Sequence, residues 1–192
     1  MPLSQNFYRQ TRRELGEKLE PESLAIIYSG RAVQQSLDAD YPFYTDNNFY
    51  YLTGIEEPDV TLLMKKDAGG EVSECLFIDE PDPFKEKWVG AKISIEEAQA
   101  LSGIKDVRYN TELESFILQE TRFDNLYFDF TMPKHQSYGG NHPAAAVVPV
   151  VLRYVDDRPV GVSGRRVDAC ALVGRNHAVG GVASPLHRIE SG

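Results

Sequence analysis

Short hydrophobic runs recur along the first two thirds of the chain, and turn-forming residues separate them. Residues 24–28 (Leu-Ala-Ile-Ile-Tyr) form one such run, closed by Gly30. A run of this length bounded by a turn residue predicts a buried strand. Residues 49–53 (Phe-Tyr-Tyr-Leu-Thr) have the same character and precede Gly54. We therefore expect a second strand there, with Gly54 permitting the turn that follows.

The segment before the first predicted strand has helical spacing. Intervals of three and four positions place four residues on one side of a helix: Tyr8, Arg12, Leu15 and Leu19. The long Arg12 side chain is expected to lie along this apolar side and to reach solvent with its guanidinium group. Pro21 is expected to end the helix.

Further strands are predicted downstream. Residues 60–64 and 75–78 are apolar, and the turn-forming residues 67–70 (Asp-Ala-Gly-Gly) lie between them. This order predicts a hairpin. Residues 107–109 and 125–130 have the composition of two short strands.

Two helix starts are marked by capping boxes, in which a hydroxyl and a glutamate three residues later satisfy orphan amides at the helix start. Ser94 and Glu97 form the first pair, and Thr111 and Glu114 form the second. Gly103 is placed to end the first of these helices. Strands alternating with helices predict an α/β fold, with a mixed β-sheet flanked by helices.

The chain changes character near residue 134, so we divide it into a domain over residues 1–134 and an atypical tail over residues 135–192. All eight lysines lie in the first part, where acidic residues outnumber basic ones 25 to 14. The tail has six arginines against four acidic residues and no sustained helical or strand period. We expect an irregular C-terminal tail, and a disordered extension and an out-of-frame gene end both remain open.

Composition excludes several classes of protein. With 192 residues, 42% of them hydrophobic, the chain can bury a core, and its net charge of −9 disfavours nucleic acid and anionic membrane surfaces as partners. Its polar start does not resemble a secretory signal, and no run approaches a membrane span. Cys75 and Cys170 form no CxxC pair, and Cys75 is expected to be a buried, reduced thiol. These features predict a cytoplasmic protein.

We find no recognisable catalytic centre and no metal site in the sequence. Phosphate-binding glycine loops, nucleophile elbows and HExxH are absent. The histidines do not pair at ligand spacing: His135, His142, His177 and His187. His135 and His142 flank a Gly-Gly pair, so a metal site there remains an alternative to a solvated loop. Residues 79–83 (Asp-Glu-Pro-Asp-Pro) are compatible with a cation-binding loop or with an ordinary turn.

Two residues outside the regular elements are candidates for binding. Trp88 is the only tryptophan, and it suits either a binding surface on an exposed loop or a packed position in the core or between domains. Asp38 forms an acidic pair with Asp40 just before aromatic residues. This pair suits a cation, or an arginine or amide partner.

Several motifs agree in order and spacing with one known family. Residues 36–43 (Ser-Leu-Asp-Ala-Asp-Tyr-Pro-Phe), residues 46–54 (Asp-Asn-Asn-Phe-Tyr-Tyr-Leu-Thr-Gly) and the pair Glu57-Pro58 come first. Leu76-Phe77, Asp82 and residues 86–90 (Glu-Lys-Trp-Val-Gly) follow. Over residues 8–130 the chain resembles the N-terminal domain of aminopeptidase P, in the creatinase and prolidase superfamily.

The resemblance implies a multidomain enzyme. In that family a "pita-bread" catalytic domain follows and holds two divalent ions, typically manganese. A bridging hydroxide attacks the carbonyl before proline, so the substrates are peptides with proline at the second position. Members are commonly homo-oligomers, and the N-terminal domain helps to shape a substrate pocket. By this resemblance Trp88 would form an aromatic wall for substrate, and Asp38 a polar anchor at the domain interface.

The tail departs from the family pattern, because it carries neither the ligand set of the catalytic domain nor the expected linker helix. We therefore expect this chain alone to hydrolyse nothing and to bind no manganese tightly. Two functions remain open: the non-catalytic domain of a Xaa-Pro metalloaminopeptidase, and a stand-alone protein-interaction module derived from such a domain. An in-frame catalytic domain downstream would favour the first function.

Overall fold

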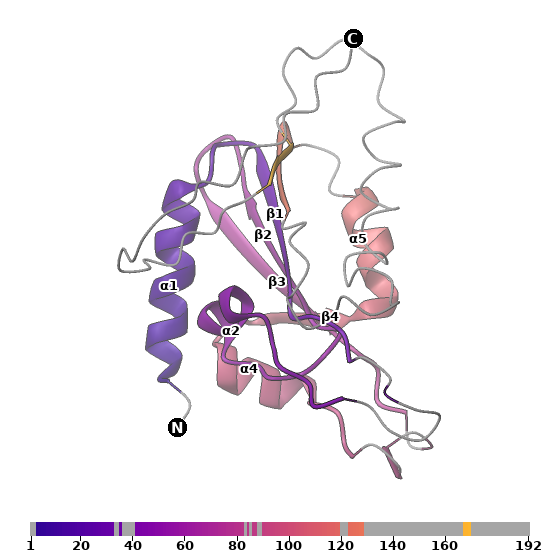
Figure 1. The fold of residues 1–192 in the computed structure, drawn as a ribbon. Coiled ribbons are helices and arrows are strands. Elements are labelled where there is room, and N and C mark those ends of the chain that lie inside the picture. The colour runs from indigo at the N-terminus through magenta and orange to yellow at the C-terminus, as the bar shows by residue number, and fades with distance from the viewer. Residues whose placement is uncertain are drawn as a thin grey trace.

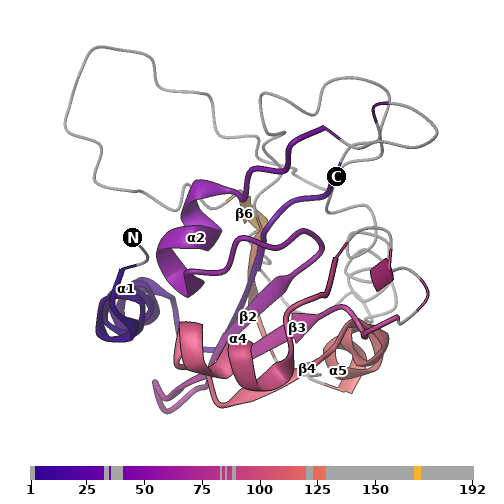
Figure 2. The same cartoon turned by 90° about the horizontal axis from the view of Figure 1, so that it is seen from below.

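A computed structural model describes residues 3–32, 35, 41–82, 84, 86–87, 90–119, 123–128 and 167–169. Helices cover both faces of a mixed sheet, as the sequence predicts (Figures 1 and 2). Three helices lie on one face: α1 (Gln5–Lys18), α2 (Asn47–Thr53) and α4 (Ile95–Ser102). On the other face lies α5 (Leu113–Gln119), preceded by the short 3₁₀ helix η1 (Asn110–Glu112).

In the described residues the sheet has the strand order β4-β3-β2-β1-β5-β6. The strands are β1 (Ser23–Tyr28), β2 (Thr61–Lys66), β3 (Val72–Ile78), β4 (Asp106–Tyr109), β5 (Asn125–Phe128) and β6 (Val167–Ala169). Only β2 is antiparallel to its neighbours, while β1, β3, β4, β5 and β6 share one direction. The ends of β1, β3 and β4 therefore lie at the same end of the sheet, called here the carboxyl end.

The predicted hairpin is confirmed. β2 and β3 pair in antiparallel register, with Leu62 opposite Leu76. Asp67 organises the turn, because its carboxylate accepts the amide of Glu71 at 2.8 Å and its carbonyl accepts the amide of Gly70 at 3.1 Å. The predicted strands at residues 24–28 and 107–109 are confirmed as β1 and β4, and β5 begins where expected.

Strand alternation divides the core into two layers. Ala25 and Ile27 point to the face covered by α1, α2 and α4, whereas Leu24 and Ile26 point to the face covered by α5. On the α5 side the rings of Phe77 and Phe116 meet edge to face, with centroids 5.4 Å apart. A sheet buried on both faces explains why the middle of β1, Leu24 to Ile27, is continuously apolar.

The prediction of a strand at residues 49–53 is wrong, because these residues form helix α2. The side chain of Asp46 accepts the amide of Phe49 at 3.0 Å and caps the start of the helix. Gly54 ends it in the left-handed conformation, with φ 74°. The buried residues Phe49, Leu52 and Thr53 follow helical spacing, so capping and packing override the β-propensity of the aromatic run.

The first capping box is confirmed and the second is not. Ser94 and Glu97 make both reciprocal bonds at the start of α4, and Gly103 ends that helix with φ 75°. Thr111 instead lies inside η1, and its hydroxyl donates to the Glu80 carboxylate at 2.9 Å. α5 begins only at Leu113, because the preceding turn is the tighter 3₁₀ form.

The expectation that Arg12 reaches solvent is also wrong. Its side chain is 0% exposed and lies between α1, α2 and β3. Nε donates to the Glu74 carboxylate at 2.8 Å, and Nη1 donates to the carbonyl of Leu52 at 2.6 Å. Burial lowers the pKa of the guanidinium, and the Glu74 carboxylate opposes that effect. The acceptors come from distant parts of the chain, so the helical spacing of α1 could not reveal them.

Cys75 is a buried free thiol, as predicted. Cys170, the four histidines and most of residues 135–192 lie outside the described residues, so the predicted tail is not tested. The one described segment of the tail is β6, which pairs in parallel with β5. Within the described residues, the helices are too short or too polar to cross a bilayer.

Candidate functional site at the carboxyl end of the sheet

Two long segments leave the carboxyl end of the sheet (Figure 1). The first loop, residues 29–46, follows β1, and the second loop, residues 79–94, follows β3. Asp38 belongs to the first loop and Trp88 to the second, and both residues lie outside the described residues. The strand directions therefore bring together the two loops that carry the predicted site residues, without describing these residues themselves.

Hydrogen bonds close the base of the first loop. The carbonyl of Ser29 accepts the amide of Asp46 at 2.8 Å, which joins the two ends of the loop. Ser29 also pairs with Val60, just before β2. Its amide donates to the Val60 carbonyl at 2.9 Å, and its hydroxyl accepts the Val60 amide at 3.0 Å. The loop thus begins and ends at one fixed point on the sheet.

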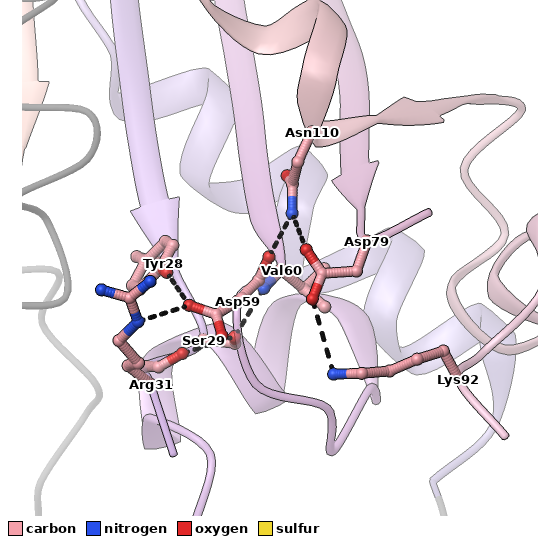
Figure 3. A network of polar contacts seen from close by, with 9 residues as sticks. Tyr28, Ser29, Arg31, Asp59, Val60, Asp79, Lys92 and Asn110 are labelled. Atoms are coloured by element: carbon pink, nitrogen blue, oxygen red, sulfur yellow. Dashed lines mark hydrogen bonds and ion pairs between the residues drawn. The ribbon is translucent and has the colours of Figure 1, made fainter. Parts of the chain in front are cut away.

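Asp59 is the first centre of a polar network at this end (Figure 3). Its carboxylate accepts the Tyr28 hydroxyl at 2.6 Å and lies 3.3 Å from Nε of Arg31. Burial, and then the bond to the carboxylate, raise the pKa of Tyr28 well above its usual value, so the hydroxyl remains a donor. Asp59 itself has φ 59°, a conformation that aspartate tolerates better than most residues.

Asn110 is the second centre, and it joins Asp59 to the second loop (Figure 3). Its amide nitrogen donates to the Asp59 carbonyl and to the Asp79 carboxylate, both at 2.7 Å. The other oxygen of Asp79 lies 3.5 Å from Nζ of Lys92. Because Asp79 begins the second loop and Lys92 lies near its end, this pair closes the base of that loop.

Glu57 extends the network toward the family motif Glu57-Pro58. Burial raises the pKa of its half-buried carboxyl group, and the charge of Lys92 opposes this shift. The carboxylate of Asp79 also faces this group and raises its pKa further. Lys92 therefore pairs with Asp79, and its charge also opposes the rise in the pKa of Glu57.

The network is suited to holding the bases of the two loops. Asp79 bonds to Asn110 and Lys92, which favours the ordinary turn over the cation-binding loop for residues 79–83. Among the described residues no three His, Cys, Asp or Glu side chains gather as a metal site. The carboxylates of Asp59 and Asp79 already have partners from the chain itself, and we assign no bond-breaking role to them.

Aromatic side chains project into solvent from both loops. Tyr44 is 79% exposed and Tyr41 is 52% exposed on the first loop, while Phe84 is 75% exposed on the second. Exposed rings on fixed loop bases are typical of a surface that meets a partner or ligand. The hydrophobic pattern of the sequence does not single out these rings, although their closeness in sequence to Asp38 and Trp88 is a usable signal.

Comparison with known proteins decides the family. A family model for the aminopeptidase P N-terminal domain matches residues 8–127. The chain belongs to this family. The aminopeptidase P N-terminal domain accordingly accounts for the described sheet and helices up to β5.

Curated relatives carry the same domain within longer proteins. Human Xaa-Pro aminopeptidase 3 is 29% identical over 146 residues, which is 69% of this chain and 29% of the relative. Mouse Xaa-Pro aminopeptidase 3 is 31% identical over 115 residues, which is 57% of this chain and 22% of the relative. The chain thus spans less than a third of these relatives and matches their aminopeptidase P N-terminal domain.

Solved structures agree with the fold. A Bacillus anthracis protein described as an aminopeptidase P superposes with a TM-score of 0.68 and 37% identity, over 79% of this chain and 36% of that one. Escherichia coli aminopeptidase P, in its low-pH form, gives a TM-score of 0.67 at 23% identity, over 82% of this chain and 34% of that one. The second likeness shows the fold of the aminopeptidase P N-terminal domain alone.

Proposed function

We propose that this chain is the non-catalytic N-terminal domain of a Xaa-Pro aminopeptidase, and that its carboxyl end faces the catalytic domain and the substrate. The supporting observation is that the two loops bearing Asp38 and Trp88 leave one end of the sheet. A hydrogen bond closes the base of the first loop, and an ion pair closes the base of the second. The substrates proposed for the complete enzyme are peptides with proline at the second position.

The roles of individual residues follow from the family resemblance. Trp88 would form an aromatic wall beside the substrate, and Asp38 would be a polar anchor at the domain interface. Exposed Tyr41, Tyr44 and Phe84 support an apolar contact surface around them. The two manganese ions of the complete enzyme would be held by the catalytic domain, which supplies the hydroxide that attacks the peptide carbonyl. A homo-oligomer and a cytoplasmic location remain predictions of the sequence.

A domain exchange tests this proposal. Residues 8–127 would replace the matching domain of the Bacillus anthracis protein, and hydrolysis of a peptide with proline at its second position would be measured with manganese present. We expect the chimaera to retain activity, and this chain alone to have none. Trp88→Ala in the chimaera should raise KM because the substrate loses an aromatic contact.

Two results would count against the proposal. One is robust cleavage by this chain alone. The other is a folded, manganese-loaded chimaera that is no more active than its catalytic domain without an N-terminal domain. The second result would favour the stand-alone interaction module, for which the exposed aromatic residues of the two loops would be the contact surface.

A further inference from the structure

The Asn110 side chain bonds to the supports of both loops. Its amide nitrogen reaches the Asp59 carbonyl on one side and the Asp79 carboxylate on the other. Asp59 in turn holds Tyr28, at the end of β1, and Arg31, within the first loop. Asp79 begins the second loop and pairs with Lys92 near its end.

The ion pairs around Asn110 hold the two loops less firmly than the two hydrogen bonds from its neutral amide do. The pairs Arg31–Asp59 and Lys92–Asp79 are partly exposed and longer than 3 Å, and such pairs stabilise a protein only weakly. The two bonds from Asn110 are 2.7 Å long and partly buried, and one of them ends on a charged carboxylate. Short, charge-assisted bonds define position better than exposed ion pairs do.

The side chain of asparagine suits this bridge for a chemical reason. One amide nitrogen carries two hydrogens, so it can donate to two oxygens at once. An aspartate of nearly the same size has no donor when ionised, and at residue 110 it would face the Asp79 carboxylate and the Asp59 carbonyl. The bridge would then become a repulsive contact between the supports of the two loops.

We propose that Asn110 is a positioning residue that sets the spacing between the first and second loops, and thereby between the substrate-contacting residues they carry. The inference rests on the proposed function for its effect on substrate. Its effect on the loops themselves does not depend on catalysis. Asn110 contacts Asp59 and Asp79, which support the loops, so it acts on the loops through these two residues.

The first experiment measures hydrogen exchange in this chain, without any enzyme assay. Asn110→Asp should speed amide exchange in peptides from both residues 29–46 and residues 79–94. Ser102→Ala is the matched control, because it removes two buried hydrogen bonds within and just after α4, to Ala98 and Ile104. The control should lower the melting temperature and leave exchange in both loops unchanged.

The second experiment uses the active chimaera. Asn110→Asp should raise KM roughly tenfold while kcat stays within about twofold, because displaced loops weaken substrate binding. The double variant Asn110→Asp with Asp79→Asn exchanges donor and acceptor and restores one bond between these positions. It should recover most of the lost affinity, which a general loss of stability would not do.

The outcomes separate this inference from the proposed function. An inactive chimaera with coupled exchange in both loops would reject the proposed function and support the bridge. An active chimaera in which Asn110→Asp changes neither KM nor exchange would overturn the inference. An equal rise in KM for Ser102→Ala would also overturn it, since stability alone would then explain the effect.

Discussion

The helical layer and the carboxyl end of the sheet use polar side chains in different ways. On the helical side of the sheet, Lys66 at the end of β2 donates to the main-chain carbonyls of Gly16 and Leu19. Arg12 of α1 donates to the main-chain carbonyl of Leu52 and pairs with the Glu74 carboxylate. At the carboxyl end Asp59 and Asp79 bind mainly other side chains and remain partly exposed. The first arrangement locks elements together, and the second orients loops. Substitutions in the helical layer should therefore change stability, and substitutions at the carboxyl end should chiefly change loop position.

The largest effect is expected at Arg12. Arg12→Met keeps an apolar stem but leaves the Glu74 carboxylate and the buried Leu52 carbonyl without this donor. Breaking a buried ion pair from one side costs about 3–5 kcal/mol in the free energy of unfolding. Urea denaturation would measure the loss. Arg13→Met is the matched control, since that side chain is exposed. An equal loss of stability in the two variants would show that the buried contacts of Arg12 do not stabilise the fold.

The next effect tests the close approach between α1 and the end of α2. A Cβ atom at Gly54 would lie 2.4 Å from the Tyr8 ring, and Gly54 has a backbone φ of 74°. Gly54→Ala should cost about 2–4 kcal/mol, from backbone strain and overpacking together. Gly70→Ala is the control, because Gly70 has φ 87° but open space around it, and it should cost only about 1 kcal/mol. Thermal unfolding of both variants measures the difference, and similar melting temperatures would contradict the close contact.

A smaller effect is expected at Lys66. Its ammonium group lies 3.0 Å from the Gly16 carbonyl and 2.8 Å from the Leu19 carbonyl, at the C-terminal end of α1. Lys66→Met should cost about 1–2 kcal/mol, because a cation favourably placed at the helix terminus is lost. Chemical denaturation would measure it beside Lys105→Met, an exposed control. If only Lys105→Met lowered the free energy of unfolding, the end of α1 would not depend on Lys66.

The smallest effect is expected at the carboxyl end. Tyr28→Phe removes the hydroxyl that Asp59 accepts and should cost about 1 kcal/mol at pH 7. The folded protein raises the pKa of Tyr28, so the stability from this shift is present below pH 10 and is lost as pH rises further. The stability gap between the wild type and Tyr28→Phe should therefore shrink above about pH 10. Denaturation of both proteins at pH 7 and pH 10.5 measures this difference in stability. A larger difference at pH 10.5 would contradict the expected loss of the Tyr28 contribution.

The sequence predicted those parts of the fold whose signals are local. The β2–β3 hairpin needed only two apolar runs and a glycine-rich turn, and α4 needed only Ser94, Glu97 and Gly103. The α2 segment was mispredicted because its aromatic run has the composition of a strand. Its helical state depends on Asp46, Gly54 and burial against the sheet.

The candidate site was less predictable, because its contacts join distant residues. Asn110 bonds to Asp79 across 31 positions and to Asp59 across 51, and no local spacing reveals such bonds. Arg12 and Glu74 are likewise 62 positions apart. The roles of Asp38 and Trp88 rest on the family resemblance and stay predictions, while the strand directions place the loops that carry them at one end of the sheet.

The turn between β2 and β3 has a practical use, because it lies at the end of the sheet opposite the two loops (Figure 1). Its residues 67–70 are exposed, and Gly70 has open space around it. Exposed turn tips of small and polar residues accept inserted peptides well. An epitope or a fluorophore inserted between Ala68 and Gly69 should therefore allow the domain to be captured or tracked while its carboxyl end stays unobstructed.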